Sequence, residues 1–460
     1  MDKSLVILEI GGAYTKCGYS GESTPRFIIP TDLSPIDLSQ YLSSGTPYFD
    51  NSITDNSNTD NNNNNNENVK KNRLPTSLEL KDALFNFLNR LFYKYLLCKP
   101  NEKKIVIVEN ILMPRLFRQS LASVLFERFK VISILYLSPT VSLLPLLRTT
   151  ALIIDIGLRE SRILPVYEGV GLMKSYKTIT NGQFNILLNL KKMLLDDLIT
   201  KNRSVVLDNM NNEALPVNEA KAAIESLSNN QLEDIAVKTL VVSPLNRQLS
   251  AVGTHYQLSQ QRSIVISPEV RLHAADILFS NPMLNNQPTT TTTTGDNNNN
   301  NNNKDDYNSY CDNDDIVDLL LDTLAECDID IRKSLTHSIL LVGGTSMLPG
   351  FKSRLSQEIE KRLGSSLSET NTQQQQQNNR YKQLNGLSNH FEFIKHAFQP
   401  NYLMWLGASL VGTLDSFSSH SRITNEQFTK FGINKLPEYE KMTHLLPPTI
   451  ATSLFSSVSK

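Results

Sequence analysis

Several features that mark common classes of protein are missing from this sequence of 460 residues. Its 45 Lys and Arg and its 46 Asp and Glu leave a formal net charge of -1. No basic tract stands out that could neutralise the phosphates of a nucleic acid. No apolar run approaches the roughly 18 residues that a membrane-spanning helix needs. We therefore expect neither a nucleic-acid partner nor a membrane span.

Cysteine and histidine are also sparse and poorly grouped. The four cysteines lie far apart and form no Cys-x-x-Cys pair: Cys17, Cys98, Cys311 and Cys327. Such cysteines are typical of free thiols in a reducing compartment, which favours a cytoplasmic protein. The seven histidines form no His-x-x-x-His pair. The sequence therefore gives no support for a metal site of the zinc type.

Three polar tracts interrupt the chain. One is Asn-rich at about 51–72, one is Thr-, Asn- and Asp-rich at about 284–315, and one is Gln- and Asn-rich at about 371–380. Such segments cannot bury enough apolar surface to offset the entropy of ordering them, so we interpret them as disordered surface insertions. The alternative is a functional aggregation or condensation element.

The remaining residues alternate between strand and helix patterns. Short apolar runs predict strands at 5–8, 105–108, 151–154 and 338–342. Apolar residues at helical spacing predict helices at 77–97, 116–129, 184–198 and 351–363. This alternation favours an α/β fold with covered sheets.

One pattern occurs twice, each time as an apolar strand, an acid, a glycine and a second strand-like run. The first copy runs from Glu9 through Gly11 and Gly12 to Lys16, and the second begins at Asp155-Ile-Gly157. A glycine lets backbone N–H groups approach a phosphate, and a carboxylate at the strand end can hold Mg²⁺ through its waters. Two such hairpins facing each other would clamp a polyphosphate. The alternative is that each is only a tight turn.

A third glycine-containing turn lies near the end of the strand at 338–342. There Gly343, Gly344 and Thr345 stand between a strand and a helix. A diglycine at such a place lets the backbone lie flat against a base or a sugar. Alone this signal is weak, because any strand-to-helix turn can use glycines.

Taken together, these blocks resemble the actins and actin-related proteins. The resemblance also runs through Thr15–Arg26, Pro165–Gly169, Cys327–Lys333 and Trp405–Leu410, in family order from residue 5 to about 430. It implies an actin-like two-lobed α/β fold, with duplicated ribonuclease-H-like domains around a nucleotide cleft. The lobes would be residues 1–150 and 151–400, with 401–460 returning to the first lobe and ending in a tail.

The resemblance also implies which residues bind a nucleotide. We expect ATP or ADP in a structural role, and we leave open whether magnesium is held. The residues that match the family's cofactor site, or replace its members, are Glu9, Gly11, Gly12, Lys16, Asp155, Gly157, Arg159, Gly343, Gly344 and Thr345.

Several family residues are replaced. Leu158 stands where actins place a second aspartate, and Ser138 replaces the glutamine that orients the attacking water. Because phosphoryl transfer depends on positioning and electrostatics, these losses should cost several kcal/mol of transition-state stabilisation. We therefore predict no catalytic residue and no turnover. Arg159 replaces a glycine and could neutralise phosphate charge where magnesium is poorly held.

Within the family, the sequence is most similar to the divergent subunits at the pointed end of the dynactin filament. The similarity is seen at 155–161, 327–333 and 343–351. Between residues 33 and 74, where actins build their second subdomain, no β pattern is recognisable. A chain with this subdomain reduced could dock on a filament and offer nothing to a next subunit. Alternatively, the Asn-rich tract is an insertion in an intact subdomain.

The sequence thus predicts a non-catalytic cap on the pointed end of the actin-like filament of dynactin. Its partners would be filament subunits, other pointed-end subunits and, indirectly, dynein, in the cytoplasm and cytoskeleton. Two alternatives remain open. One is a nuclear actin-related subunit of a chromatin-remodelling complex, and the other is a weak ATPase of the actin superfamily.

Overall fold

The computed structural model describes residues 5–37, 75–209, 213–245, 252–280, 315–364, 380–414 and 422–437. The chain folds as two compact units. Unit 1 comprises Met1–Thr149, Glu168–Gly171 and Tyr402–Lys460, and unit 2 comprises Thr150–Tyr167 and Leu172–Asn401. Most of the region expected to hold a reduced second subdomain, together with most of each polar tract, lies outside the described residues.

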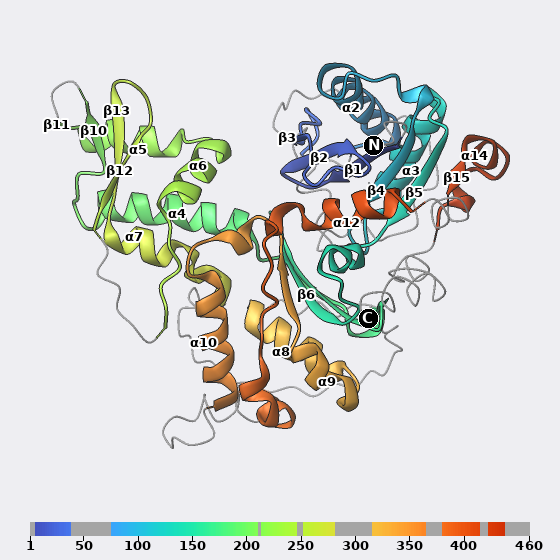
Figure 1. Ribbon diagram of the computed structural model, residues 1–460. Coiled ribbons are helices and arrows are strands. Elements are labelled where there is room, and N and C mark those ends of the chain that lie inside the picture. The colour runs from blue at the N-terminus through green and yellow to red at the C-terminus, as the bar shows by residue number, and fades with distance from the viewer. Residues whose placement is uncertain are drawn as a thin grey trace, which may run out of the picture. The chain divides into compact units, whose positions relative to one another are not determined.

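Unit 1 is built on a six-stranded sheet in the order β15-β5-β4-β1-β2-β3 (Figure 1). Strand β1 pairs parallel with β4 and antiparallel with β2, so β1 and β2 form a hairpin. The strands of this sheet are β1 (Leu5–Ile10), β2 (Tyr14–Tyr19), β3 (Phe27–Pro30), β4 (Lys104–Val108), β5 (Ser133–Leu137) and β15 (Ile423–Thr424). The two-residue strand β8 (Val170–Gly171) belongs to this unit but not to this sheet.

Helices cover this sheet and supply much of its core. They are α2 (Ser77–Arg90), η2 (Leu91–Tyr95), η3 (Pro100–Glu102), α3 (Arg115–Ser123), η4 (Val124–Arg128), η5 (Pro139–Leu146), α12 (Leu403–Gly412), α14 (Asn425–Phe431) and η13 (Gly432–Lys435). Helix α2 starts at a capping box, in which the Thr76 hydroxyl accepts from the Glu79 N–H and the Glu79 side chain accepts from the Thr76 N–H. Such a box satisfies two N–H groups that a helix start otherwise leaves unpaired.

The C-terminal part of the chain is tied into unit 1 through α12. The only tryptophan of the sequence, Trp405, is fully buried, and its Nε1 donates to the Ile7 carbonyl of β1 at 3.2 Å. Gly407 lies against η5 so closely that an added Cβ would collide with the Val141 carbonyl. This contact explains why the helix carries a glycine at its centre despite the cost in helix propensity.

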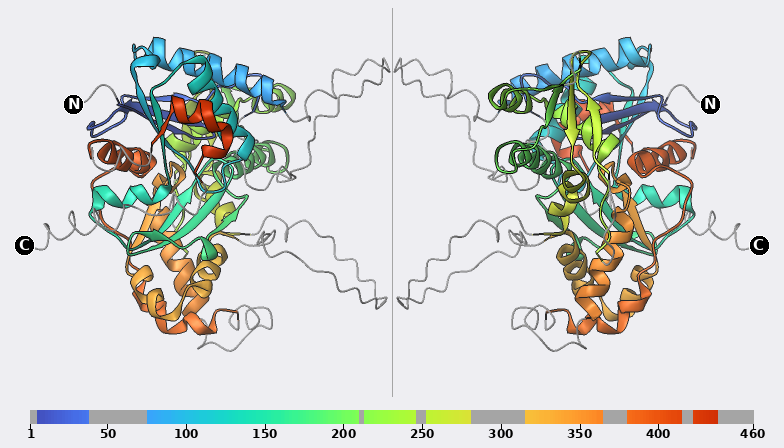
Figure 2. Two further views of the ribbon diagram at one scale, coloured as in Figure 1. Left: turned by 90° about the vertical axis from the view of Figure 1, so that its right-hand side faces the viewer. Right: turned by 90° about the vertical axis from the view of Figure 1, so that its left-hand side faces the viewer.

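Unit 2 contains two sheets. The first runs β14-β6-β7, with β9 also paired to β7, and the second runs β11-β10-β13-β12. In the right-hand view of Figure 2 the second sheet lies toward the viewer. The strands are β6 (Ala151–Ile156), β7 (Ser161–Tyr167), β9 (Lys177–Ile179), β10 (Val206–Asp208), β11 (Glu213–Ala214), β12 (Thr254–Gln257), β13 (Arg262–Ile266) and β14 (Ile339–Val342).

Most helices of unit 2 share one apolar core with the strands β6, β7 and β14. Figure 1 shows α8, α9 and α10 on one side of β6. The helices are η6 (Met173–Ser175), α4 (Gln183–Ile199), α5 (Val217–Glu225), α6 (Asn229–Thr239), α7 (Pro268–His273), η7 (Ala274–Phe279), α8 (Ile316–Glu326), α9 (Ile329–Thr336), η9 (Thr345–Met347), α10 (Phe351–Gly364) and η11 (Lys382–His390), and η12 (Pro400–Tyr402) precedes α12.

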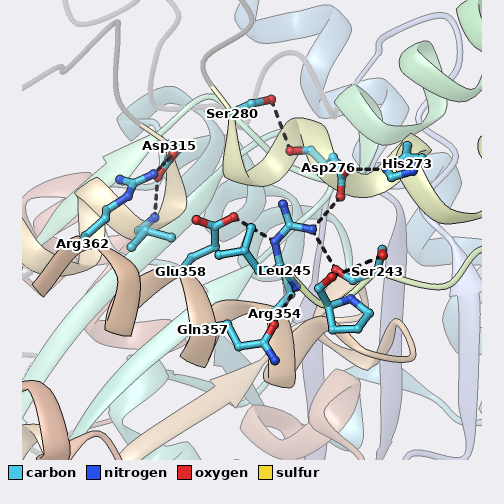
Figure 3. A network of polar contacts seen from close by, with 12 residues as sticks. Ser243, Leu245, His273, Asp276, Ser280, Asp315, Arg354, Gln357, Glu358 and Arg362 are labelled. Atoms are coloured by element: carbon cyan, nitrogen blue, oxygen red, sulfur yellow. Dashed lines mark hydrogen bonds and ion pairs between the residues drawn. The ribbon is translucent and has the colours of Figure 1, made fainter. Parts of the chain in front are cut away.

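Arg354 on helix α10 forms polar contacts with neighbouring segments of unit 2 (Figure 3). Its Nη1 donates to the Ser243 carbonyl at 2.7 Å and to Asp276 Oδ1 at 3.2 Å. Its Nε donates to Glu358 Oε1, one turn further along the helix, at 2.8 Å. Arg362, two turns after Arg354 along α10, pairs with Asp315, which also caps the start of α8. The charged side of α10 thus fixes the loop at Ser243, the helix η7 at Asp276 and the start of α8.

The predicted α/β fold is confirmed. The helix predicted at 77–97 is present as α2 and then continues as the π-helical turn η2, with the expected residues Leu80, Leu84, Phe87 and Leu88 buried. None of the helices in the described ranges is both long enough and apolar enough to cross a membrane.

Candidate functional site

The two sequence repeats form two hairpins of the same geometry. In unit 1, Glu9 on β1 lies opposite Lys16 on β2, and the two side chains form an ion pair. In unit 2, Asp155 on β6 lies opposite Arg162 on β7, and Arg162 Nη1 donates to Asp155 Oδ2 at 3.1 Å. In each hairpin the acid and the base are therefore cross-strand neighbours and stand seven residues apart.

The glycine of each hairpin takes part in its turn. The Gly11 N–H donates to the Tyr14 carbonyl, and the Gly157 N–H donates to the Glu160 carbonyl, both at 3.0 Å. A Cβ on Gly11 would lie 2.8 Å from that Tyr14 oxygen, which is closer than real Cβ contacts allow. A Cβ on Gly157 would lie 3.2 Å from the Glu160 oxygen, a less severe contact. The tight turn thus accounts for Gly11 by itself, and phosphate binding by these loops stays a prediction.

Asp155 belongs to a buried cluster of three charges. Arg162 also pairs, through Nη2, with the carboxylate of Glu160, which is 3% exposed. Burial alone would lower the pKa of Arg162, but the charges of Glu160, Tyr176 and Asp155 outweigh it and hold the pKa above its ordinary value. One guanidinium therefore remains charged between two carboxylates, as its planar fork of donors allows.

The turn after β14 lies against the same strand end. Gly343 has φ +89, and a Cβ there would collide with the Ile156 carbonyl and lie 2.8 Å from Asp155 Oδ1. Thr345 Oγ1 reaches the Gly157 carbonyl at 3.4 Å. Gly344, in contrast, has no heavy atom within 4 Å of the position a Cβ would take. The structure thus brings Asp155, Gly157, Gly343 and Thr345 together in unit 2.

Arg159 and Leu158 at the hairpin tip contact the start of α4. The Arg159 guanidinium lies over the ring of Phe184, 4.1 Å from its centroid. The Leu158 carbonyl accepts from the Phe184 N–H at 2.7 Å, and a Cβ on Gly182 would lie 2.8 Å from the same oxygen. Arg159 therefore has an aromatic partner, and its predicted role beside phosphates stays a prediction.

Ser138 is buried at the end of β5, where the resemblance expects a water-orienting glutamine. Its hydroxyl shares a hydrogen bond of 2.7 Å with Thr140 Oγ1, and Ser142 Oγ donates to the Pro139 carbonyl at 2.8 Å. The side chain is short and already has a partner within its own segment. Nothing in this arrangement supplies the reach of a glutamine amide.

A magnesium ion does not fit the end of β6. Magnesium is held by carboxylate oxygens and waters, yet the Asp155 carboxylate already has Arg162 as its cation, and the side chains of both residues are only 12% exposed. Leu158 adds no oxygen ligand from its side chain. Across the described ranges, no three His, Cys, Asp or Glu side chains gather closely enough to hold a metal ion.

A phosphate fits the first hairpin better. The Lys16 ammonium has three N–H donors, and its contact with Glu9 occupies one of them. The side chain is 14% exposed, so it is not sealed from solvent. Lys16 is thus compatible with the phosphate-binding role that the resemblance implies for it.

The sequence reading missed Arg162 and Glu160. The predicted site includes the base Lys16 from the first repeat, but only Asp155, Gly157 and Arg159 from the second. The signal was present, because both bases follow their acids by seven residues. In a hairpin with a turn of fixed length, equal spacing places such residues opposite each other.

Comparison with known proteins gives the family. A sequence model described as "Actin" matches residues 1–436. A protein of Dictyostelium discoideum, actin-related protein 10, is 41% identical over 96% of this chain and 90% of its own length. These findings confirm the resemblance inferred from the motifs. The chain belongs to the actin family.

Proposed function

We propose that this chain is a non-catalytic actin-related subunit that caps the pointed end of the short actin-like filament of dynactin, and so supports dynein-driven transport along microtubules. Its partners are then the filament subunits and the other pointed-end subunits, in the cytoplasm and at the cytoskeleton. The similarity to actin-related protein 10 and the family motifs at 155–161, 327–333 and 343–351 support this assignment.

The observation that carries the non-catalytic role is the occupied carboxylate at the end of β6. Asp155 is bonded to Arg162, and the second acid of actins is replaced by Leu158, whose backbone carbonyl is bound to the start of α4. Ser138 lacks the amide that would orient water. Because phosphoryl transfer needs such positioned charges and donors, loss of all three supports binding without turnover.

Purification of the native assembly tests the structural role. The full-length chain, tagged and expressed in its own cells, should co-purify with the filament and pointed-end subunits of dynactin. A tagged conventional actin, treated in the same way, is the control for binding through the shared fold. Recovery with subunits of a chromatin-remodelling complex instead would contradict the proposal and favour the nuclear alternative.

Nucleotide analysis tests the absence of turnover. Denaturing the purified chain and separating the released nucleotide should give intact ATP, in a fixed ratio to protein. Recovery of ADP, or steady release of phosphate from added ATP, would contradict the non-catalytic role and favour the weak ATPase. Recovery of no nucleotide would contradict the proposal that the chain binds a structural nucleotide. It would leave the result of the co-purification test unchanged.

A further inference from the structure

We propose that Arg162 takes the place of a divalent cation at Asp155 in unit 2, so that the acid at the end of β6 has its cation within the chain. A carboxylate at a strand end can hold magnesium through its waters, and here the acid faces a fixed guanidinium. The proposal concerns the cation alone, so it does not depend on whether a nucleotide is bound or which assembly the chain joins.

The geometry of the cluster supports a built-in cation. Arg162 reaches Asp155 from Nη1 and Glu160 from Nη2, so its two terminal nitrogens serve two different carboxylates. Thr178 Oγ1 also donates a hydrogen bond to Glu160 Oε2 at 3.4 Å. The two acids are thus held on either side of one positive group.

Because the cluster is buried, the charge of the Arg162 guanidinium strongly affects whether a cation can bind beside Asp155. The side chains of Asp155 and Arg162 are each 12% exposed, and that of Glu160 is 4% exposed. Solvent screens such charges little, so a divalent cation beside Asp155 would be repelled by the guanidinium next to it. In addition, Asp155 Oδ2 already accepts a hydrogen bond from Arg162.

The backbone around Asp155 restricts the other oxygen as well. The Gly343 turn approaches so closely that a Cβ there would lie 2.8 Å from Oδ1. The Gly343 turn therefore adjoins this carboxylate on the side away from Arg162. The charge of the neighbouring guanidinium disfavours a hydrated metal ion at this strand end.

The test uses the full chain and magnesium chloride as the only added ligand. The melting temperature is measured in EDTA and in millimolar magnesium chloride for the natural protein and for Asp155→Asn. We expect the two proteins to respond equally, because no cation is held at Asp155. A magnesium-dependent rise in the natural protein that Asp155→Asn abolishes would overturn the proposal.

A second variant tests the role of Arg162 directly. Arg162→Met removes the guanidinium and leaves two buried carboxylates that converge on its place, so magnesium should now raise the melting temperature by about 2–4 °C. Arg162→Lys keeps one positive charge and should show no such rise. A folded Arg162→Met protein without any magnesium response would contradict the assigned role. If Arg162→Met does not fold, the comparison with Asp155→Asn still decides.

Discussion

Arg162 lies directly opposite Asp155 across the β6–β7 hairpin, and its guanidinium donates to the aspartate at 3.1 Å. The same relationship joins Lys16 to Glu9 across the β1–β2 hairpin. The duplicated motif thus includes a base as well as an acid and a glycine. In each hairpin the acid thus has a cation within the chain.

Removal of the Arg162 guanidinium should destabilise unit 2 strongly. Arg162→Met leaves Asp155 and Glu160 buried without their cation, and breaking a buried pair from one side typically costs about 3–5 kcal/mol. Chemical denaturation followed by circular dichroism measures the change. Arg159→Met in the same hairpin is the matched control: its guanidinium lies over the ring of Phe184, a contact worth about 0.5–1 kcal/mol, and not between two buried carboxylates. Equal losses in the two variants would contradict the cluster's importance.

The two glycines after β14 should respond in opposite ways to alanine. Gly343→Ala forces a side chain into a left-handed backbone, with φ +89, and into the Ile156 carbonyl. We expect a loss of about 1–3 kcal/mol in the free energy of unfolding. Gly344 has helical backbone angles and open space, so Gly344→Ala should be neutral or stabilise by about 0.4–1 kcal/mol. The melting temperatures of the two variants test this prediction. Similar values would contradict the expected difference between the two positions.

Arg354 should matter far more than other helical ion pairs of the same spacing. Arg354→Met would leave the buried Glu358 without its cation and free the Ser243 carbonyl, at an expected cost of about 3 kcal/mol or more. Lys221 and Glu225 on α5 have the same i,i+4 spacing, but both are exposed. Lys221→Met should therefore change stability by less than about 0.5 kcal/mol. Urea titration measures both, and a comparable loss in each would contradict the prediction.

Trp405 should report on the unfolding of unit 1. It is the only tryptophan and is fully buried, so its emission should move to longer wavelength when α12 separates from β1. Gly407→Ala places a methyl group against the Val141 carbonyl and should lower the free energy of unfolding by about 1–3 kcal/mol. The denaturant midpoint of the tryptophan signal should fall accordingly. Gly386→Ala has open space and should leave the midpoint unchanged. An unshifted midpoint in Gly407→Ala would rule out the close contact.

The sequence by itself determined the family, the α/β fold and the duplicated hairpin. These follow from local patterns: apolar runs with period 2 or 3.6, and acids and glycines at fixed places after strands. It also identified Asp155 and Lys16, because their residue types and positions match family motifs. The departures at Leu158 and Ser138 were visible for the same reason.

Only the tertiary structure decided which cation serves Asp155. Arg159 and Arg162 lie three residues apart in one hairpin, and the sequence alone suggested a role only for Arg159, beside the phosphates of a nucleotide. Strand pairing places Arg162 opposite the acid and leaves Arg159 over Phe184. Residue order gives the available charges, but register and packing select which charges meet, and these depend on contacts far apart in the chain.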